Sequence, residues 1–318
     1  MEYTTLGGTG EKVSRVGLGI WQFSQSWGIV EYRDAFKIVS RAIEVGINLV
    51  DTALIYGGGT SERFLGQALK EIGVARDEVL ISTKIPGELL SFDDTFRALD
   101  LSLKRLQTSY VDIIQAHWPP IWRHIPICEY ARALERLVSL GRARYIGLSD
   151  HPKPVVEEFL SCLSKYDVEV LQYRFNLAER EAEKEIVPLA EELDATLTAW
   201  SPLAKGAILG KYSLEDIEKL KDVRSGEALF KPDNYRQILA LSEKIKEIAS
   251  RIGKTPAQVA LNWLIMYSDN IVPIPGAKSE AQVEENAGAV GWRLSYSDWR
   301  LLDEESRKLK LSYVTYEE

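Results

Sequence analysis

The stretch Ile47-Asn48-Leu49-Val50-Asp51 is a short run of mostly apolar, β-branched residues that ends on a carboxylate. Two later stretches have the same form: Val79-Leu80-Ile81-Ser82-Thr83-Lys84 ends on an amine, and Val111-Asp112-Ile113-Ile114-Gln115-Ala116-His117 ends on an imidazole. Asp51, Lys84 and His117 lie 33 positions apart. This interval is typical of a repeating strand–helix unit. Because such units bring the ends of neighbouring parallel strands to one rim, we expect the three side chains to meet there.

Strand-like and helix-like segments alternate on both sides of these stretches. The expected strands are 15–19, 47–51, 79–84, 111–117, 145–149, 168–172, 195–200 and 270–274. The expected helices are 33–45, 60–72, 92–106, 127–140, one after Pro152, 182–193, 235–251 and 256–268, with a hairpin through Gly7 to Gly10 before them and a helical tail at 295–309. The connection 201–234 is longer than an ordinary barrel loop, which favours a functional segment.

Eight strand-then-helix units with near-continuous apolar strands predict a closed parallel (β/α)8 TIM barrel, with a short N-terminal hairpin and extra C-terminal helices. The alternative is an open doubly wound sheet. It is disfavoured because the glycine-rich G-x-G-x-x-G turn is absent after the first expected strand. No linker or low-complexity segment interrupts the pattern, so we expect residues 1–318 to form a single domain.

Composition and charge exclude several classes of partner. The chain has 318 residues and a formal net charge of −8, which argues against nucleic acid and anionic membranes. It contains no apolar run of bilayer-spanning length and no visible signal peptide, so we expect a soluble cytoplasmic protein. Cys128 and Cys162 are the only cysteines and have no C-x-x-C spacing, so neither a disulfide framework nor a thiolate zinc site is expected. The histidines form no H-x-H pair, which disfavours a metal-dependent barrel hydrolase.

Four residues form a coherent proton-delivery group. An unpaired lysine at a barrel rim is costly, so Lys84 needs a counter-ion, and Asp51 on the adjacent strand can supply one. Tyr56 follows on the next loop, and a neighbouring ammonium group lowers the pKa of a phenol. We predict that Tyr56 is the general acid, Lys84 lowers its pKa, Asp51 holds Lys84, and His117 hydrogen-bonds the substrate oxygen. Each also has a structural reading: a helix cap, a solvated amine, a satisfied histidine, and an aromatic anchor for a glycine-rich loop.

These residues, together with later motifs, resemble the aldo-keto reductase family. The motifs are Asp51-Thr52-Ala53 with Tyr56-Gly57, Lys84, His117, Gly147-Leu148-Ser149-Asp150-His151, Gln172 with Asn176, Trp200-Ser201-Pro202-Leu203, and Pro273-Ile274-Pro275-Gly276-Ala277-Lys278 before Gln282-Val283-Glu284-Glu285-Asn286. The resemblance extends over nearly the whole chain. The Trp-Ser-Pro-Leu and Gly-Lys-Tyr (210–212) pieces resemble the branch that includes the potassium-channel β subunits and related microbial reductases.

The resemblance implies a nicotinamide cofactor, NADPH with NADH possible, bound across the barrel top without a Rossmann fold. Ser149, Asp150 and Gln172 would hold the carboxamide, and Trp200 would stack on the nicotinamide. The pyrophosphate would lie against 201–206 with Lys211, and the adenosine end against 276–286. The full set of expected cofactor-binding residues is Gly19, Ile20, Trp21, Asp51, Ser149, Asp150, Gln172, Trp200, Ser201, Pro202, Leu203, Lys205, Gly206, Lys211, Gly276, Lys278, Ser279, Gln282, Glu285 and Asn286.

The segment after the last expected strand also predicts an anion site on physical grounds. Ser279-Glu280-Ala281-Gln282 is a capping-box pattern, so a helix should begin near Ser279, with Lys278 beside its N-terminus. Free N–H groups, a positive helix end and an amine favour the 2′-phosphate of NADPH. Mutual capping of Ser279 and Gln282 is equally compatible with the pattern.

Two positions depart from the family pattern. Position 150 is Asp where the family usually has Asn, and a carboxylate accepts but cannot donate a hydrogen bond. Position 282 is Gln where many relatives carry Arg, so the charge-assisted part of a phosphate contact is lost. These departures leave the strictness of the NADPH preference open.

The expected substrate pocket contains Trp21, Tyr56, His117 and Trp118, with Trp27 and Trp122 as further aromatics that could equally be loop anchors. Such a pocket suits an aldehyde or ketone, so we predict reversible, NADPH-dependent reduction to an alcohol, with hydride from the nicotinamide and a proton from Tyr56. Two alternatives stay open: an NADP(H)-binding redox-sensing or regulatory subunit with little turnover, and a Schiff-base lyase that uses Lys84. The sequence does not predict the physiological carbonyl compound, the direction of flux or the oligomeric state.

Overall fold

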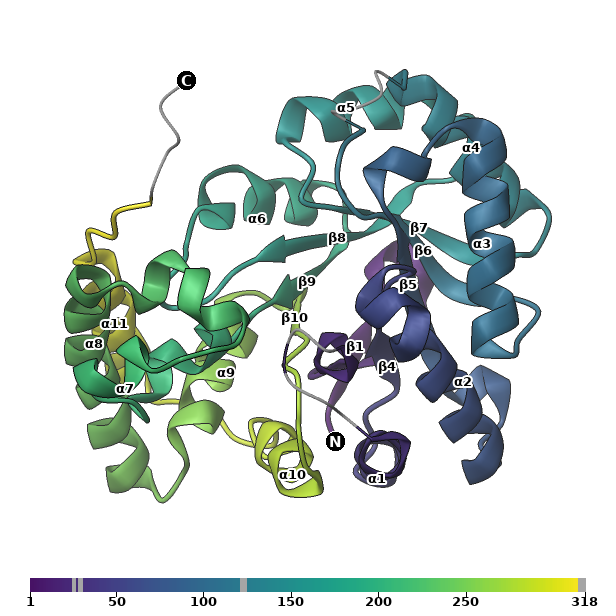
Figure 1. Cartoon of the computed structure of the whole chain (residues 1–318). Helices are drawn as coiled ribbons and strands as arrows, with labels where there is room; N and C mark the ends of the chain where they lie inside the picture. The colour runs from purple at the N-terminus through teal and green to yellow at the C-terminus, as the bar shows by residue number, and fades with distance from the viewer. Residues whose placement is uncertain (25–26, 28–30, 121–124, 314–318) are drawn as a thin grey trace.

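Eight parallel strands in sequence order form the centre of the computed structural model (Figure 1), which describes residues 1–24, 27, 31–120 and 125–313. The strands are β3 (Leu18–Gly19), β4 (Leu49–Asp51), β5 (Leu80–Ile85), β6 (Val111–Ala116), β7 (Ala143–Ser149), β8 (Val168–Arg174), β9 (Thr196–Trp200) and β10 (Ile271–Pro273). Each pairs in parallel with the next along the chain. The expected TIM barrel is confirmed. Trp122 lies outside the described residues.

The first and last strands close the barrel through a few contacts. The Gly17 amide donates to the Pro273 carbonyl at 2.9 Å, and the Gly19 amide donates to the Pro275 carbonyl at 3.1 Å. A Cβ atom on Gly19 would lie 2.8 Å from the Ile274 carbonyl oxygen. This close approach of two backbones therefore requires glycine.

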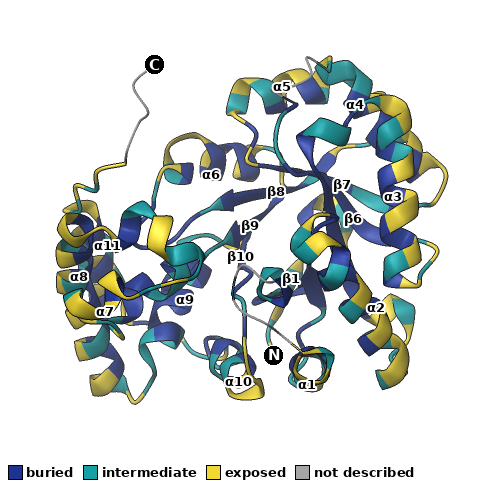
Figure 2. Ribbon diagram, in the orientation of Figure 1, coloured by how far each residue is buried: buried dark blue, intermediate teal, exposed yellow. Residues whose placement is uncertain are grey.

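Helices surround the barrel and turn their apolar faces inward, as the dark inner faces in Figure 2 show. They are α1 (Tyr32–Glu44), α2 (Thr60–Ile72), α3 (Phe92–Leu106), α4 (Ile127–Ser139), α5 (Lys153–Cys162), α6 (Ala182–Glu192), α7 (Leu214–Glu218), α8 (Pro232–Ile252), α9 (Pro256–Tyr267), α10 (Glu280–Ala287) and α11 (Tyr296–Arg307). In α1 the buried residues Ala35, Ile38, Val39 and Ala42 recur at helical spacing. The capping box expected before α9 is present, because Thr255 and Gln258 exchange side-chain and backbone hydrogen bonds.

Most predicted limits agree with the structure, and the differences have local causes. The hairpin is confirmed as β1 (Tyr3–Thr5) and β2 (Lys12–Ser14), which pair antiparallel. The first barrel strand is shorter than the predicted 15–19, because the Arg15 amide donates to the Glu2 carbonyl at 2.9 Å, beside the N-terminal hairpin and not in the barrel. The connection 201–234 is not a plain loop, since it contains α7 and several 3-10 turns.

The structure contains one disulfide that the sequence analysis did not predict. Cys128 in the first turn of α4 and Cys162 at the end of α5 are joined, with their Cα atoms 5.1 Å apart. The two helices lie side by side on the barrel surface (Figure 1). Chain spacing of the C-x-x-C kind does not detect this bridge, because the cysteines are 34 residues apart, about one barrel repeat.

Two kinds of feature are absent from the described residues. No described helix is long and apolar enough to cross a membrane. Within the same part of the chain, no group of three or more His, Cys, Asp or Glu side chains could hold a metal ion.

Candidate active site

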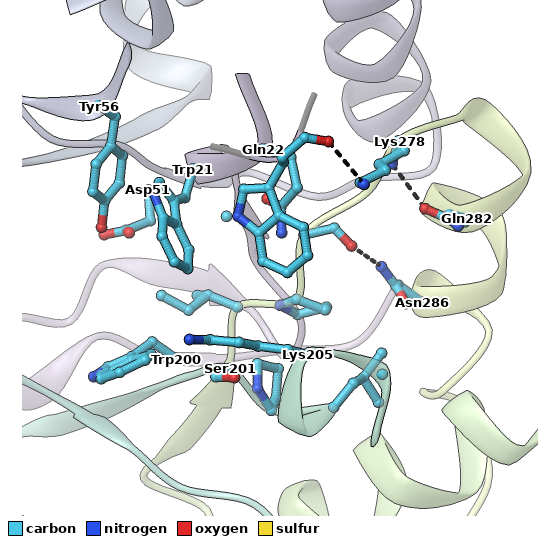
Figure 3. A pocket seen from close by; sticks show the side chains of 18 of the residues that line it. Trp21, Gln22, Asp51, Tyr56, Trp200, Ser201, Lys205, Lys278, Gln282 and Asn286 are labelled. Atoms are coloured by element: carbon cyan, nitrogen blue, oxygen red, sulfur yellow. Dashed lines mark hydrogen bonds between the residues drawn. The ribbon is translucent and has the colours of Figure 1, made fainter. Parts of the chain in front are cut away.

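A cavity of about 670 Å³ opens at the carboxyl ends of the barrel strands. Its lining includes most of the residues predicted from sequence: Gly19, Trp21, Asp51, Tyr56, His117, Trp118, Ser149, Asp150, Gln172, Trp200, Ser201, Pro202, Leu203, Lys205, Gly206, Lys211, Gly276, Lys278, Gln282, Glu285 and Asn286. Figure 3 shows Tyr56 and Asp51 at one end of this cavity and Lys278, Gln282 and Asn286 at the other.

Lys84 lies beneath the cavity floor and is paired as expected. Its side chain is fully buried, and its Nζ donates to Asp51 Oδ1 at 2.5 Å and to the Thr52 carbonyl at 2.7 Å. Asp51 Oδ2 also accepts from Ser82 Oγ at 3.0 Å and from Gln172 Nε2 at 2.9 Å. Asp51 is therefore a counter-ion and not the cap of α2, whose N-cap residue is Gly59.

Tyr56 opens the 3-10 turn η3 (Tyr56–Gly59) directly above this ion pair. Lys84 Nζ donates to Tyr56 Oη at 3.4 Å, so the phenol and the amine share the site as predicted. One part of the prediction needs correction. Burial raises the pKa of Tyr56 more than Lys84 lowers it, and Asp51 and Asp150 raise it further, so the pKa of the phenol lies above its ordinary value. The prediction from sequence included the effect of the Lys84 charge on the pKa of Tyr56 but not the effect of burial.

His117 follows β6 and faces Tyr56, with the two ring centroids 5.6 Å apart. Burial, together with the nearby Lys84 charge, lowers the pKa of His117 well below its ordinary value. The imidazole is therefore neutral at physiological pH and can donate one hydrogen bond. Its Nδ1 has no partner among the described residues. The adjacent Trp118 is held by a hydrogen bond from its Nε1 to Glu88 Oε2 at 3.1 Å.

The ends of β7, β8 and β9 form the wall beside Tyr56. Asp150 Oδ1 accepts a hydrogen bond from Trp200 Nε1 at 3.0 Å. The Arg174 guanidinium lies 4.4 Å from the centroid of the Trp200 ring. Trp200 is thus fixed on its edge and on one face. Ser201 Oγ is buried without a partner in the described part of the chain.

Cationic side chains line the cavity together with Glu285. Lys278 precedes α10 at the far end, Lys211 is a lining residue, and Arg224 is paired with Asp222 at 2.6 Å. Ser279 Oγ caps α10 by accepting from the Gln282 amide, but Gln282 Oε1 accepts from the Lys278 amide at 2.8 Å. The predicted reciprocal box is therefore only half formed. Asn286 Nδ2 donates to the Gly276 carbonyl at 3.3 Å.

Three predicted site residues do not line the cavity: Ile20 is fully buried in the core, Ser279 caps α10, and Lys84 lies below the floor. Sequence reasoning also missed Gln22, Tyr212 and Arg224 as lining residues. Arg224 belongs to the long connection that was expected to be functional. Because no motif surrounds it, only its charge within that segment could have identified it.

The lining suits a long, polar, anionic ligand such as a dinucleotide phosphate. Gln22 Oε1, Trp27 Nε1 and Ser201 Oγ are buried at the cavity with no partner among the described residues. Gly206 has φ +90°, and a Cβ there would meet nothing within 4 Å, so its backbone is open to the cavity. Unpaired buried polar groups are costly, so a ligand that bonds them is stabilised.

Known proteins share both the sequence and the architecture. The model of the aldo/keto reductase family matches residues 15–307. The aldo-keto reductase YhdN of Bacillus subtilis is 31% identical over 94% of this chain and 91% of its own. A probable voltage-gated potassium channel subunit beta of Arabidopsis thaliana is 32% identical over 91% of each chain. An aldo/keto reductase from Klebsiella pneumoniae, solved with NADP and acetate, has a TM-score of 0.77 and 26% identity over 99% of this chain and 100% of its own.

Proposed function

We propose, from the premise that this chain belongs to the aldo/keto reductase family of oxidoreductases, that it interconverts an aldehyde or ketone and the corresponding alcohol with NADP(H). The observation that carries the proposal is the position of Lys84 Nζ. It bonds both Asp51 and Tyr56 directly beneath a cavity that His117 also lines. This arrangement supplies a protonated phenol, a cation that stabilises the phenolate, and a neutral imidazole at one place.

The chain's own residues account for the proton and for the substrate orientation, while the bound nicotinamide supplies or accepts a hydride. In the reducing direction Tyr56 donates its proton to the carbonyl oxygen. Lys84 stabilises the phenolate that remains, because its ammonium group donates to Tyr56 Oη. The ammonium stays in place because leaving Asp51 would separate a buried ion pair. His117, being neutral, donates a hydrogen bond to the same oxygen. Trp21 and Trp118 line the cavity beside these groups.

The cofactor would extend from Tyr56 toward α10. Ser149, Asp150 and Gln172 would face the carboxamide, and Trp200 the nicotinamide ring. Arg224, Lys211 and Lys278 would hold the phosphates through charge. Lys278 at the N-terminus of α10 favours the 2′-phosphate, and therefore NADPH, while the neutral Gln282 leaves NADH possible. The NADP-bound relative from Klebsiella supports this assignment.

Replacing Tyr56 with Phe tests the proposal. Tyr56→Phe should abolish turnover of a panel of aldehydes, because the variant lacks the hydroxyl that lines the cavity and bonds Lys84. It should leave NADPH binding, measured by fluorescence titration, within about threefold of the wild type. Near-normal rates in the variant would remove Tyr56 from the proton-transfer step.

The similarity to a potassium channel β subunit supports a second candidate, an NADP(H)-binding redox sensor with little turnover. Steady-state NADPH oxidation separates the two, because tight binding with only a single turnover would favour the sensor. The Schiff-base alternative is poorly supported, since the Lys84 amine is fully buried and bonded to Asp51 and Thr52. Borohydride trapping of an adduct on Lys84 would revive it.

We keep two further predictions as part of this proposal, a single domain over residues 1–318 and a cytoplasmic location. The Cys128–Cys162 bridge fits a cytoplasmic location only in a hyperthermophile, because cytosolic disulfides persist chiefly in such organisms.

A further inference from the structure

Asp150 holds an acidic side chain at the wall of the cavity. It follows directly after β7 and adopts φ +52°, a left-handed conformation that Asp and Asn tolerate better than most residues. Its side chain lines the cavity and reaches solvent through it, and its one side-chain hydrogen bond with a described residue comes from Trp200 Nε1. That bond fixes the carboxylate beside the Trp200 ring.

The cations near Asp150 are already neutralised by other carboxylates. Three ion pairs surround this region: Lys84 with Asp51, Arg174 with Glu179, and Lys205 with Glu227. Asp150 itself makes no salt bridge to any described residue. The ionised carboxylate therefore adds a net negative charge to this end of the cavity.

The ionisation of Asp150 responds to groups on several elements. Burial raises the pKa of Asp150 to about 6, although the Trp200 N–H, Arg174 at the end of β8 and Lys84 on β5 each lower it. Asp150 also acts on two phenols, Tyr56 after β4 and Tyr173 on β8. Its negative charge raises the pKa of both. Above about pH 6 the charge is present, and below it the side chain becomes a neutral acid.

The reacting ring of a dinucleotide must lie at the Asp150 end of the cavity. Tyr56 and Trp200 lie together at that end, and the cationic group around Lys278 lies at the other (Figure 3). A ligand whose phosphates bind Lys278, Lys211 and Arg224 therefore extends its nicotinamide toward Tyr56 and Asp150. The oxidised nicotinamide is a cation, whereas the reduced ring is uncharged.

We propose that the Asp150 carboxylate makes this site bind the oxidised cofactor in preference to the reduced one, so that at equal concentrations of the two forms the protein carries mostly NADP⁺. The inference rests on the proposed function. When NADP⁺ and an alcohol are bound, the alcohol carbon loses a hydride to the nicotinamide, and the hydroxyl proton passes to the Tyr56 oxygen. A fixed negative charge close to the ring stabilises only the charged form, and a neutral amide at position 150 would not.

The decisive experiment compares two dissociation constants in the wild type and in Asp150→Asn. Quenching of tryptophan fluorescence at pH 8 gives the Kd of NADP⁺ and the Kd of NADPH. Asp150→Asn keeps the shape and the tolerance of positive φ while removing the charge. We expect the ratio of Kd(NADP⁺) to Kd(NADPH) to rise about tenfold, mainly through weaker NADP⁺ binding. As a matched control, Glu285→Gln removes one charge from the far end of the same cavity and should leave the ratio unchanged.

A pH series on the wild type provides a second measurement that needs no variant. Between pH 8 and pH 5.5 the preference for NADP⁺ should fall as Asp150 is protonated, and in Asp150→Asn the ratio should stay flat. The cofactor 2′-phosphate also titrates near pH ~6, but it is common to both forms and cancels in the ratio.

The outcomes separate this inference from the function on which it rests. If both cofactors bind but the ratio in Asp150→Asn is the same as in the wild type, Asp150 does not set the redox preference and the proposed function stands. If neither cofactor binds the wild type at millimolar concentration, the proposed function and this inference both fall.

Discussion

Replacing Lys84 with Met should destabilise the protein strongly at neutral pH. The change leaves the Asp51 carboxylate buried without its cation, and removing one partner of a buried ion pair costs about 3–5 kcal/mol. Asp51 would keep its hydrogen bonds from Ser82 and Gln172, at 3.0 and 2.9 Å. Those bonds place the expected loss at the lower end, about 3 kcal/mol in the free energy of unfolding. Met occupies a similar volume, so a cavity adds little.

Urea unfolding followed by tryptophan fluorescence measures this loss, and a second variant isolates its cause. In Asp51→Asn/Lys84→Met no buried charge remains, so the double variant should recover at least about 1.5 kcal/mol relative to Lys84→Met. The reasoning is refuted if Lys84→Met loses less than about 1 kcal/mol, or if the double variant is no more stable than the single one.

The same pair predicts a pH dependence with a definite sign. Burial lowers the pKa of Lys84, but Asp51 and Tyr56 raise it more, so the folded pKa lies above the ordinary value of 10.5. A raised pKa contributes stability that is fully present below 10.5 and is lost as pH rises through the folded value. The stability difference between the wild type and Lys84→Met should therefore narrow only in strongly alkaline solution.

Two further predictions concern the disulfide and the cofactor. Cys128→Ser/Cys162→Ser should lower the free energy of unfolding by about 3–4 kcal/mol, because the bridge closes a loop of 34 residues; the same denaturation midpoint with and without reductant in the wild type would contradict this. Gln282→Arg should tighten NADPH binding about tenfold and leave NADH unchanged, since the new guanidinium would lie beside Lys278. Equal changes in both titrations would place the 2′-phosphate elsewhere.

The parts of the fold that depend on local pattern could be predicted from sequence. The helices α2 and α3 begin and end where apolar periodicity and flanking residues place them. Asp51, Lys84 and His117 meet because a strand's carboxyl end has a fixed place in a parallel barrel. Asp51 ends β4 and Lys84 lies on β5, and these two strands pair in parallel. Their ion pair therefore follows from the order of the strands.

Features that depend on distant surfaces could not be predicted in this way. The bridge between Cys128 and Cys162 depends on how α4 lies against α5, which no spacing rule contains. Arg224 reaches the cavity because its long connection folds back over the barrel mouth, where Asp222 and Tyr212 hold the guanidinium. Neither the cysteine pair nor Arg224 belongs to a motif, so their positions follow from packing alone.

The pKa of Tyr56 shows how a correct set of residues can still lead to an incorrect electrostatic prediction. A nearby ammonium stabilises the phenolate, but burial destabilises any charge at that position, and in the free protein burial has the larger effect. The raised pKa keeps the phenol protonated at neutral pH, which is the state that a proton donor requires. In the proposed reaction Lys84 acts after the proton has left, when the phenolate must be stabilised. Burial and the cation would therefore support successive stages of the proposed proton transfer, with Asp51 holding the cation in place for both.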